Sequence, residues 1–244
     1  MTAANSYIAI DVETTGLAPK RDKILEIAAL YVAEGQIQDR FVTLIQPCRP
    51  IAPEITRLTG ITDDLVREAP EVEAVIGELV KFCGELPLLG HNISFDYSFL
   101  QQAAVNAGLK LPANVLDTLG LCRSFMPAGE PKNLGAACAW YGISQTEAHR
   151  AQADAVSAHL LYQKLLGQYG MERPELFAPR PLEIRVKREQ PATKRQKDYL
   201  RDLSKYHRIN VTVQIDSLSR SEASRMIDQI ISQYGRMTKK VNAE

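Results

Sequence analysis

The chain of 244 residues carries equal numbers of cationic and acidic side chains, and 45% of its residues are hydrophobic. This composition is sufficient for a normal buried core and excludes a chain that is disordered throughout. The longest apolar runs reach about a third of the roughly 20 residues that cross a bilayer, and no secretory signal is visible. Four scattered cysteines without a C-x-x-C pair argue against a zinc site and predict a cytoplasmic protein with reduced thiols.

The net charge of zero conceals an uneven distribution along the chain. Residues 1–179 hold 14 Lys+Arg and 21 Asp+Glu, a net charge of −7, whereas residues 180–244 hold 15 and 8, a net charge of +7. An acidic body and a basic tail are expected to meet different surfaces, and a polyanion is the natural partner of the tail.

The body shows strands and helices in alternation. An apolar run at 7–10 predicts a strand buried on both faces, and strands at about 24–32 and 41–45 form an antiparallel hairpin. The elements expected next are a helix at 70–84, a strand at 86–90, a helix at 94–107, a strand at 115–116, and helices at 133–141 and 152–169. This order predicts an α/β protein in which helices flank a mixed five-stranded sheet.

The C-terminal part differs from the body in composition. Residues 1–172 form the predicted body, and residues 173–192 combine prolines with charges and predict a basic linker. Residues 193–244 predict a small basic helical unit, with Thr193 capping one helix and a capping box at 219–222 opening another. A unit of this size is marginally stable on its own unless it docks on the body or on a ligand.

Two acids follow the first buried strand, at positions i and i+2. Asp11 and Glu13 therefore project from one face of an extended chain. Two such carboxylates repel each other and lose solvation unless a cation lies between them, and their oxygens suit Mg²⁺ or Mn²⁺. The alternative is a solvated strand end, and this pair alone does not decide between them.

Two further acids lie at predicted helix starts. Ser94 is expected to cap the helix at 94–107, which places Asp96 in its first turn, at the carboxyl end of a strand. Asp154 opens the helix at 152–169, five residues after His149. Taken singly, an acid in a first turn is explained by the helix dipole and a lone histidine by the surface.

The three segments together resemble the three Exo motifs of the DnaQ-like, or DEDDh, 3′→5′ exonucleases. The segments are 11–17 (DVETTGL), 91–96 (HNISFD) and 149–154 (HRAQAD), and the resemblance covers roughly residues 6–169. The family includes the exonuclease domain of DNA polymerase III. The histidine five residues before the last aspartate is typical of the histidine branch rather than the tyrosine branch.

The resemblance implies a ribonuclease H-like fold and a two-metal site. Asp11, Glu13, Asp96 and Asp154 would hold two Mg²⁺ ions, or Mn²⁺, that clamp the attacking and leaving oxygens. His149 would be the general base that takes a proton from the attacking water, a role suited to imidazole at neutral pH. The product would be a nucleoside 5′-monophosphate released from the 3′ end.

The resemblance also implies contacts to the terminal nucleotide. The backbone around Thr14 and Thr15 would hold it, Leu17 would wedge beside the last base, and Asn92 and Phe95 would line the pocket. A wedge favours single-stranded or frayed ends; core packing is an equal explanation for Leu17 and Phe95. Many relatives have His-Gly-Ile where this chain has Thr-Gly-Ile at 59–61, so a histidine contact there is not assumed.

The function expected from these features is a 3′→5′ exonuclease acting on DNA, in replication or repair. The alternatives are a proofreading subunit bound to a DNA polymerase, a 3′→5′ exoribonuclease, and a catalytically silent nucleic-acid-binding adaptor. A clamp-binding peptide of the Gln-x-x-Leu-Phe kind is not seen, which weighs against the proofreading alternative, and the tail weighs against the exoribonuclease. The basic clusters at 185–188 and 194–197 predict that the tail contacts phosphates.

Overall fold

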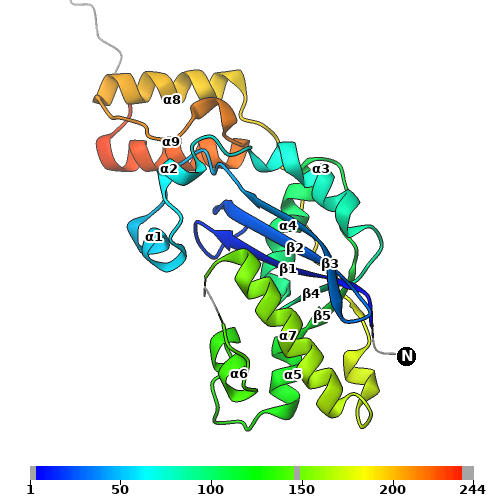
Figure 1. Ribbon diagram of the computed structural model, residues 1–244. Coiled ribbons are helices and arrows are strands. Elements are labelled where there is room, and N and C mark those ends of the chain that lie inside the picture. The colour runs from blue at the N-terminus through cyan, green and yellow to red at the C-terminus, as the bar shows by residue number, and fades with distance from the viewer. Residues whose placement is uncertain (1–3, 146–148, 238–244) are drawn as a thin grey trace, which may run out of the picture. The chain divides into compact units, whose positions relative to one another are not determined.

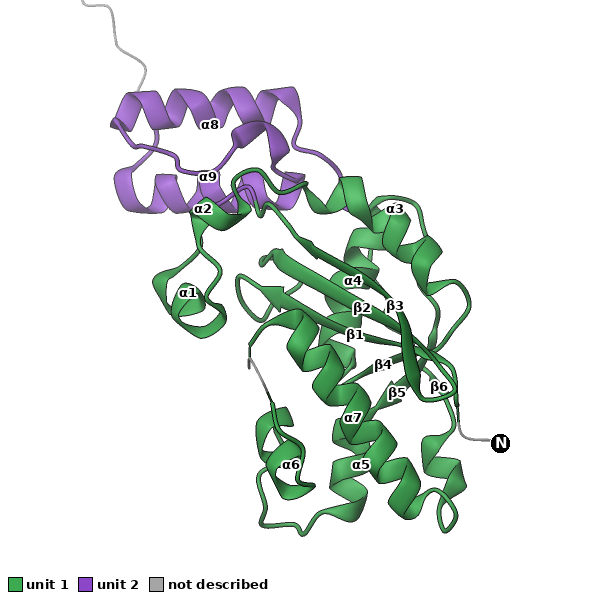
Figure 2. Cartoon of the chain, viewed as in Figure 1, with its two compact units in different colours: residues 1–47, 51–187 green, residues 48–50, 188–244 purple. Residues whose placement is uncertain are grey.

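The computed structural model describes residues 4–145 and 149–237 and divides the chain into two compact units (Figures 1 and 2). Unit 1 consists of residues 1–47 and 51–187, and unit 2 consists of residues 48–50 and 188–244. Unit 1 therefore runs through most of the segment predicted as a linker. The predicted domain boundaries after residues 172 and 192 stay predictions about independent folding.

A mixed sheet forms the centre of unit 1. Its strands are β1 (Tyr7–Thr14), β2 (Ile24–Ala33), β3 (Gln36–Leu44), β4 (Leu88–Gly90), β5 (Asn114–Asp117) and β6 (Arg180–Pro181). In the described part of the chain their order is β3-β2-β1-β4-β5-β6. β1 pairs antiparallel with β2 and parallel with β4, so the predicted mixed sheet and antiparallel hairpin are confirmed.

The prediction of five strands is wrong by one. β6 is a two-residue edge strand that pairs antiparallel with β5, and the next backbone N–H, of Leu182, donates to the carbonyl of Ala113 at 2.7 Å. A strand this short shows no alternating pattern, and its proline is tolerated because the strand lies at the edge of the sheet.

Helices cover both faces of the sheet (Figure 1). Those of unit 1 are α1 (Pro53–Thr59), α2 (Asp63–Val66), α3 (Val72–Cys83), α4 (Ser94–Asn106), α5 (Thr118–Phe125), α6 (Leu134–Trp140), α7 (Ala151–Tyr169) and the 3₁₀ helix η1 (Pro174–Phe177). The predicted helices are confirmed as α3, α4, α6 and α7. α1, α2, α5 and η1 were not predicted: elements of four to eight residues span few turns, and α2, α5 and η1 lack a glycine stop such as Gly142, which marks the end of the equally short α6. Gly60, directly after α1, was a signal of this kind.

Two apolar clusters explain why β1 is apolar on both faces. Ile8, Ile10 and Val12 pack into one cluster, which includes side chains of α3 and α4. Tyr7 and Ala9 pack into the other, with side chains of α5, α6 and α7. The central strands are therefore covered on both sides, as the continuous apolar run predicted.

Unit 2 is built on α8 (Lys194–His207) and α9 (Arg220–Tyr234), with the 3₁₀ turn η2 (Ile215–Ser217) between them. The predicted cap at Thr193 and the predicted capping box at Ser219 with Glu222 are confirmed, and Thr193 also forms a capping box with Gln196. Unit 2 has a small core of its own, formed by Leu200, Leu203, Leu218, Ala223 and Ile230.

The described helices include none with the length and apolar composition needed to cross a membrane. Cys83, Cys122 and Cys138 are buried free thiols, as their apolar neighbours predicted.

Candidate functional site

β1 carries the first two acids. Asp11 and Glu13 lie within the strand, not after it as predicted, and they share one face because side chains two apart point the same way. In the ladder Asp11 lies opposite Ala28 and Glu13 opposite Glu26, and the register shifts directly after Glu13. The sheet therefore places both carboxylates on the face that α7 covers.

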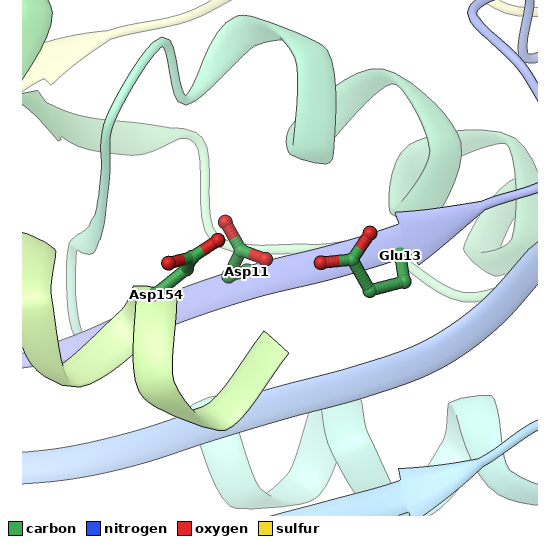
Figure 3. Close-up of side chains that lie close together, drawn as sticks. All are labelled: Asp11, Glu13 and Asp154. Atoms are coloured by element: carbon green, nitrogen blue, oxygen red, sulfur yellow. The ribbon is translucent and has the colours of Figure 1, made fainter. Parts of the chain in front are cut away.

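α7 adds the third acid. Asp154 lies in its first turn, and one carboxylate oxygen from each of Asp11, Glu13 and Asp154 lies within 4.8 Å of the other two. Figure 3 shows the three side chains converging from the strand and the helix end. Oxygen atoms at such separations can share a hard divalent cation.

Asp96 approaches the same strand from the other side of the site. It is 3% exposed in the first turn of α4, and its Oδ1 accepts a hydrogen bond from the backbone N–H of Val12 at 3.0 Å. Within the described residues it is not part of the three-acid cluster, although its charge acts on Asp11. The structure thus brings three of the four predicted acids into direct proximity and places the fourth beside their strand.

The predicted capping role of Ser94 is wrong. The N-cap of α4 is Ile93, and the Ser94 hydroxyl instead donates to Oδ1 of Asn92 at 3.2 Å. The backbone turns into the helix through Asn92, whose φ of +67° leaves Ser94 already helical. Asn tolerates this left-handed conformation better than most residues.

The site gathers acidic groups that are partly or fully buried. Burial, and then the carboxylates of Asp96, Glu13 and Asp154, raise the pKa of Asp11 well above its usual range. Burial raises the pKa of Glu13 to about 7 and that of Asp96 to about 8. Burial also raises the pKa of Asp154. Without a cation these carboxyl groups favour the protonated form, and a divalent ion would reverse that preference.

These shifts predict how stability depends on pH. A raised folded-state pKa gives stability that is present below the unfolded pKa and lost as pH rises through the folded value, about 7 for Glu13. We expect the melting temperature in chelator to fall from about pH 5 to about pH 8, and Mg²⁺ or Mn²⁺ to restore it mainly at the higher pH. Scanning fluorimetry at both pH values checks this. Equal metal stabilisation at the two pH values would contradict it.

His149 stands just before α7. Its φ is +64°, and its backbone N–H donates to Oδ2 of Asp154 at 3.2 Å, while its side chain is exposed. This backbone hydrogen bond ties the histidine to one acid of the cluster. An exposed imidazole beside the carboxylates is accessible to a substrate and to water.

An ion pair not predicted from the sequence holds this segment to the sheet. Glu26 on β2 is 2% exposed, and both of its oxygens accept hydrogen bonds from Arg150, from Nε at 3.1 Å and from Nη2 at 2.8 Å. Oε2 of Glu26 also accepts from the backbone N–H of Ala151 at 3.0 Å. One acid therefore fixes the first residue of α7 and the residue after His149. A lone charge in the apolar strand 24–32 was the signal in the sequence.

The remaining predicted site residues surround this cluster. Thr14 is buried and its hydroxyl donates to the carbonyl of Gly16 at 2.7 Å, whereas Oγ1 of Thr15 accepts from the backbone N–H of Lys23 at 2.9 Å. Leu17 is 84% exposed, so the core-packing alternative is wrong for it. Phe95 is half-buried, and its ring centroid lies 5.2 Å from that of Phe99, so packing accounts for part of its surface.

Asp117, also not predicted, organises the loop that contains Asn92. Its Oδ1 accepts hydrogen bonds from the backbone N–H groups of Asn92 at 2.8 Å and of Leu119 at 3.1 Å. The left-handed Asn92 is thereby anchored at the end of β5. The ring of His91 is engaged nearby, 2.9 Å from the hydroxyl of Thr118 and 2.7 Å from the carbonyl of Lys132.

Thr59, which replaces the histidine of many relatives, ends α1. Its hydroxyl donates to the carbonyl of Ile55 at 3.0 Å and accepts from the backbone N–H of Ile61 at 3.1 Å. The side chain is 4% exposed, so its polar group serves the turn that ends the helix.

The sheet and its flanking helices have a ribonuclease H-like fold, and the carboxylate cluster gives this fold a candidate metal centre at β1 and α7. The family model described as Exonuclease (RNase T) matches residues 8–162, more than half of the chain. The chain belongs to this exonuclease family, so the predicted resemblance to DnaQ-like enzymes and the enzyme class are confirmed.

Relatives and solved structures agree with this assignment. The chain is 38% identical over 167 residues to a DNA polymerase III of the PolC type from Bacillus cereus, a match that covers 68% of this chain and 12% of the relative. It therefore spans about an eighth of that protein's length. Among solved structures, E. coli exonuclease I in complex with a dA16 oligonucleotide matches with a TM-score of 0.59 at 20% identity, covering 71% of this chain and 42% of that one. Exonuclease X in complex with 5′ overhanging duplex DNA matches with a TM-score of 0.51 at 24% identity, covering 69% of this chain and 98% of that one.

Proposed function

We propose that this protein is a metal-dependent 3′→5′ exonuclease that releases nucleoside 5′-monophosphates from single-stranded or frayed DNA ends. The observation that carries the proposal is the convergence of Asp11, Glu13 and Asp154 in a chain of the exonuclease family. Carboxylates so placed, with raised pKa values and little countercharge, have no evident structural use without a cation.

The donor set fits hard divalent cations. Asp11, Glu13, Asp96 and Asp154 supply only oxygen atoms, which favour Mg²⁺ and Mn²⁺ over softer metals. We assign these four side chains as ligands of two Mg²⁺ ions, for which Mn²⁺ can substitute. When bound, the ions supply the positive charge that stabilises the attacking and leaving oxygens of an in-line displacement.

We assign His149 as the general base. Its backbone N–H donates to Asp154, its ring is close enough for its charge to act on that carboxylate, and an exposed imidazole can accept the proton of the attacking water. Arg150 and Glu26 hold the next residue in place, which limits how far the ring can move from the site. As the water oxygen attacks the phosphorus of the last phosphodiester, its proton passes to an imidazole nitrogen. The bond from phosphorus to the 3′ oxygen of the preceding nucleotide breaks, and this oxygen leaves and takes up a proton from solvent.

The substrate contacts follow the same segments. The turn at Thr14 and Thr15 presents its backbone beside Glu13, and Leu17 projects into solvent, where it can separate the last base from its neighbour. Asn92 and Phe95 stand at the start of α4, close in sequence to Asp96. A wedge of this kind favours ends that are already unpaired, because unstacking costs free energy.

DNA is the substrate that the comparisons favour. The similar chains are DNA polymerases III of the PolC type, and exonuclease I and exonuclease X are solved with DNA bound. The relation to polymerases also supports the proofreading alternative, in which this chain would work bound to a DNA polymerase. The basic tail, with clusters at 185–188 and 194–197, would contact phosphates of the strand that the body trims.

The substrate assignment predicts an order of rates on matched strands. In Mg²⁺ we expect single-stranded DNA to be trimmed faster than duplex DNA, and faster than RNA of the same sequence, with no trimming in chelator. Labelled strands of DNA and RNA, single and duplex, measure this in one gel series. Faster trimming of the RNA strand would replace DNA by RNA in the proposal, and trimming in chelator would remove the metal from it.

A further inference from the structure

Two sets of cations in unit 2 differ in their surroundings. On the side of η2, Nη2 of Arg201 lies 2.8 and 2.9 Å from the two oxygens of Asp216, and Nζ of Lys197 donates to the carbonyl of Asp216 at 2.8 Å. These two cations are neutralised locally and offer little to an external anion.

The second group lies where α8 and α9 end. Residues 203–215 and 229–237 contain Lys205, Arg208 and Arg236 and no Asp or Glu. All three side chains are exposed, and in the described part of the chain no ion pair involves them. These three cations therefore carry positive charge that no ion pair in the described residues offsets, as do Lys194, Arg195 and Arg220 at the helix starts.

The two helices run parallel, so their C-terminal ends meet. At their starts Gln196 donates to the carbonyl of Arg220 at 3.2 Å, and at their ends the His207 ring lies 3.0 Å from the carbonyl of Gly235. Figure 2 shows α8 and α9 side by side within unit 2. The cations that follow the two helices therefore belong to one surface.

Aromatic rings occupy the same end. The His207 ring lies between Tyr206, at a centroid distance of 4.8 Å, and Tyr234, at 5.7 Å. Each tyrosine is 49% exposed, although both are large and partly apolar. We call this surface, made of Lys205, Tyr206, His207, Arg208, Tyr234 and Arg236, the aromatic end of unit 2.

Neutralisation of the partial negative charge at the helix C-termini explains only some of the side chains on this surface. Cations near helix C-termini are favourable, because the last carbonyls carry partial negative charge, and this accounts for Lys205. It does not account for Tyr206 and Tyr234, whose half-exposed rings gain nothing from the helix dipole. Cations beside exposed aromatic rings are what single-stranded nucleic acid requires, because bases stack on rings while cations neutralise phosphates.

We propose that the aromatic end of unit 2 binds single-stranded DNA, with the Tyr206 and Tyr234 rings stacking on bases and Lys205, Arg208 and Arg236 contacting phosphates. The choice of DNA rests on the proposed function, whereas the binding itself does not. The site is separate from the clusters at 185–188 and 194–197 and adds base stacking to charge. A strand held there would remain bound while its 3′ end is trimmed.

Binding is measured on the full chain in chelator, so that no strand is cleaved. The probe is fluorescent oligo(dT) of about 20 nucleotides, longer than a typical single-strand site. We expect Tyr234→Leu to weaken binding about 5- to 100-fold, as removal of one stacking ring does, and Tyr234→Phe to leave it nearly unchanged. Equal affinity of the wild type and Tyr234→Leu, with unit 2 folded by circular dichroism, would overturn the stacking role of this ring.

The salt dependence tests the phosphate-binding role of the cations separately. Changing Lys205, Arg208 and Arg236 together to Gln should flatten the slope of log K against log salt by about 0.7 for each phosphate that is no longer neutralised. The matched control changes Lys81, Lys110 and Lys164, exposed lysines of unit 1, and removes the same charge. Equal slopes for the two triple variants would overturn the assignment to the aromatic end.

Two further measurements distinguish single-stranded DNA from other ligands and distinguish binding at the aromatic end from the exonuclease activity. Oligo(rU) bound tighter than oligo(dT), or binding only to vesicles that contain phosphatidylserine, would overturn single-stranded DNA as the ligand. Cleavage of a dinucleotide in Mg²⁺ by the wild type and by Tyr234→Leu tests the proposed function by itself. We expect equal rates there, and no cleavage by either chain would refute the exonuclease without touching the binding result.

Discussion

Asp11→Asn is expected to lower the rate of nucleotide release by at least about 10³-fold and to raise the melting temperature of the metal-free protein at about pH 8. A bound metal contributes several kcal/mol to the transition state, and each 1.36 kcal/mol is about tenfold in rate. The stability rises because the substitution removes a carboxyl group whose ionised form is disfavoured by burial and by four neighbouring carboxylates. Steady-state release of mononucleotides and thermal unfolding in chelator measure the two effects.

The opposite signs of the two effects make this prediction specific. Replacing a residue that serves only the fold lowers the stability of the protein. Replacing a metal ligand lowers the activity and relieves the repulsion between the carboxylates. Asp39→Asn is the matched control, because Asp39 is exposed on β3 and, among the described residues, its side chain accepts a hydrogen bond only from the neighbouring backbone N–H of Arg40. Full activity of Asp11→Asn would remove this residue from the site.

Glu26→Gln is expected to lower kcat about 10- to 100-fold while changing KM little, since residues that orient a metal site typically act on this scale. The substitution breaks the two-pronged interaction with Arg150, so His149 and Asp154 lose their fixed relation to β1. We also expect a loss of stability of about 1–3 kcal/mol. This is less than for a fully buried pair, because the Arg150 side chain is 42% exposed.

A double-mutant cycle separates positioning from general damage. Glu26→Gln and Arg150→Gln should each lower kcat, and the double variant should lower it by less than the product of the two effects. Arg150→Lys should restore little of the kcat that is lost in Arg150→Gln, because an ammonium group cannot donate to both oxygens of Glu26 in the way that a guanidinium group does. If Glu26→Gln is folded and its kcat is unchanged, the Glu26–Arg150 ion pair has only a structural role.

Much of the fold was predictable because its signals are local. The apolar run at Tyr7 fixes a strand buried on both faces, and the capping boxes at Thr193 and Ser219 fix where two helices begin. The site was predictable for a different reason: the segments 11–17, 91–96 and 149–154 resemble the Exo motifs of a known family. The periods of strand and helix alone place Asp11 and Glu13 on one face of β1 and Asp154 in the first turn of α7, and they do not bring the two together.

What was not predicted depends on contacts between distant segments. β6 exists only because Arg180 and Pro181 meet β5, and the Glu26–Arg150 pair joins residues 124 positions apart. Asn92 takes a left-handed conformation, held by Asp117, which displaced the predicted cap at Ser94. The spacing and composition of the sequence do not reveal these pairings, because each joins segments that are far apart along the chain.

The most direct measurement of the central claim uses one single-stranded DNA labelled at its 5′ end and the same strand labelled at its 3′ end. With Mg²⁺ we predict a ladder of shortening products from the 5′-labelled strand and immediate release of a labelled 5′-mononucleotide from the 3′-labelled strand. Both reactions should stop in chelator and in Asp154→Asn. Release of the 5′ label first, internal cuts, or equal rates with Asp154→Asn would contradict a 3′→5′ exonuclease built on these carboxylates.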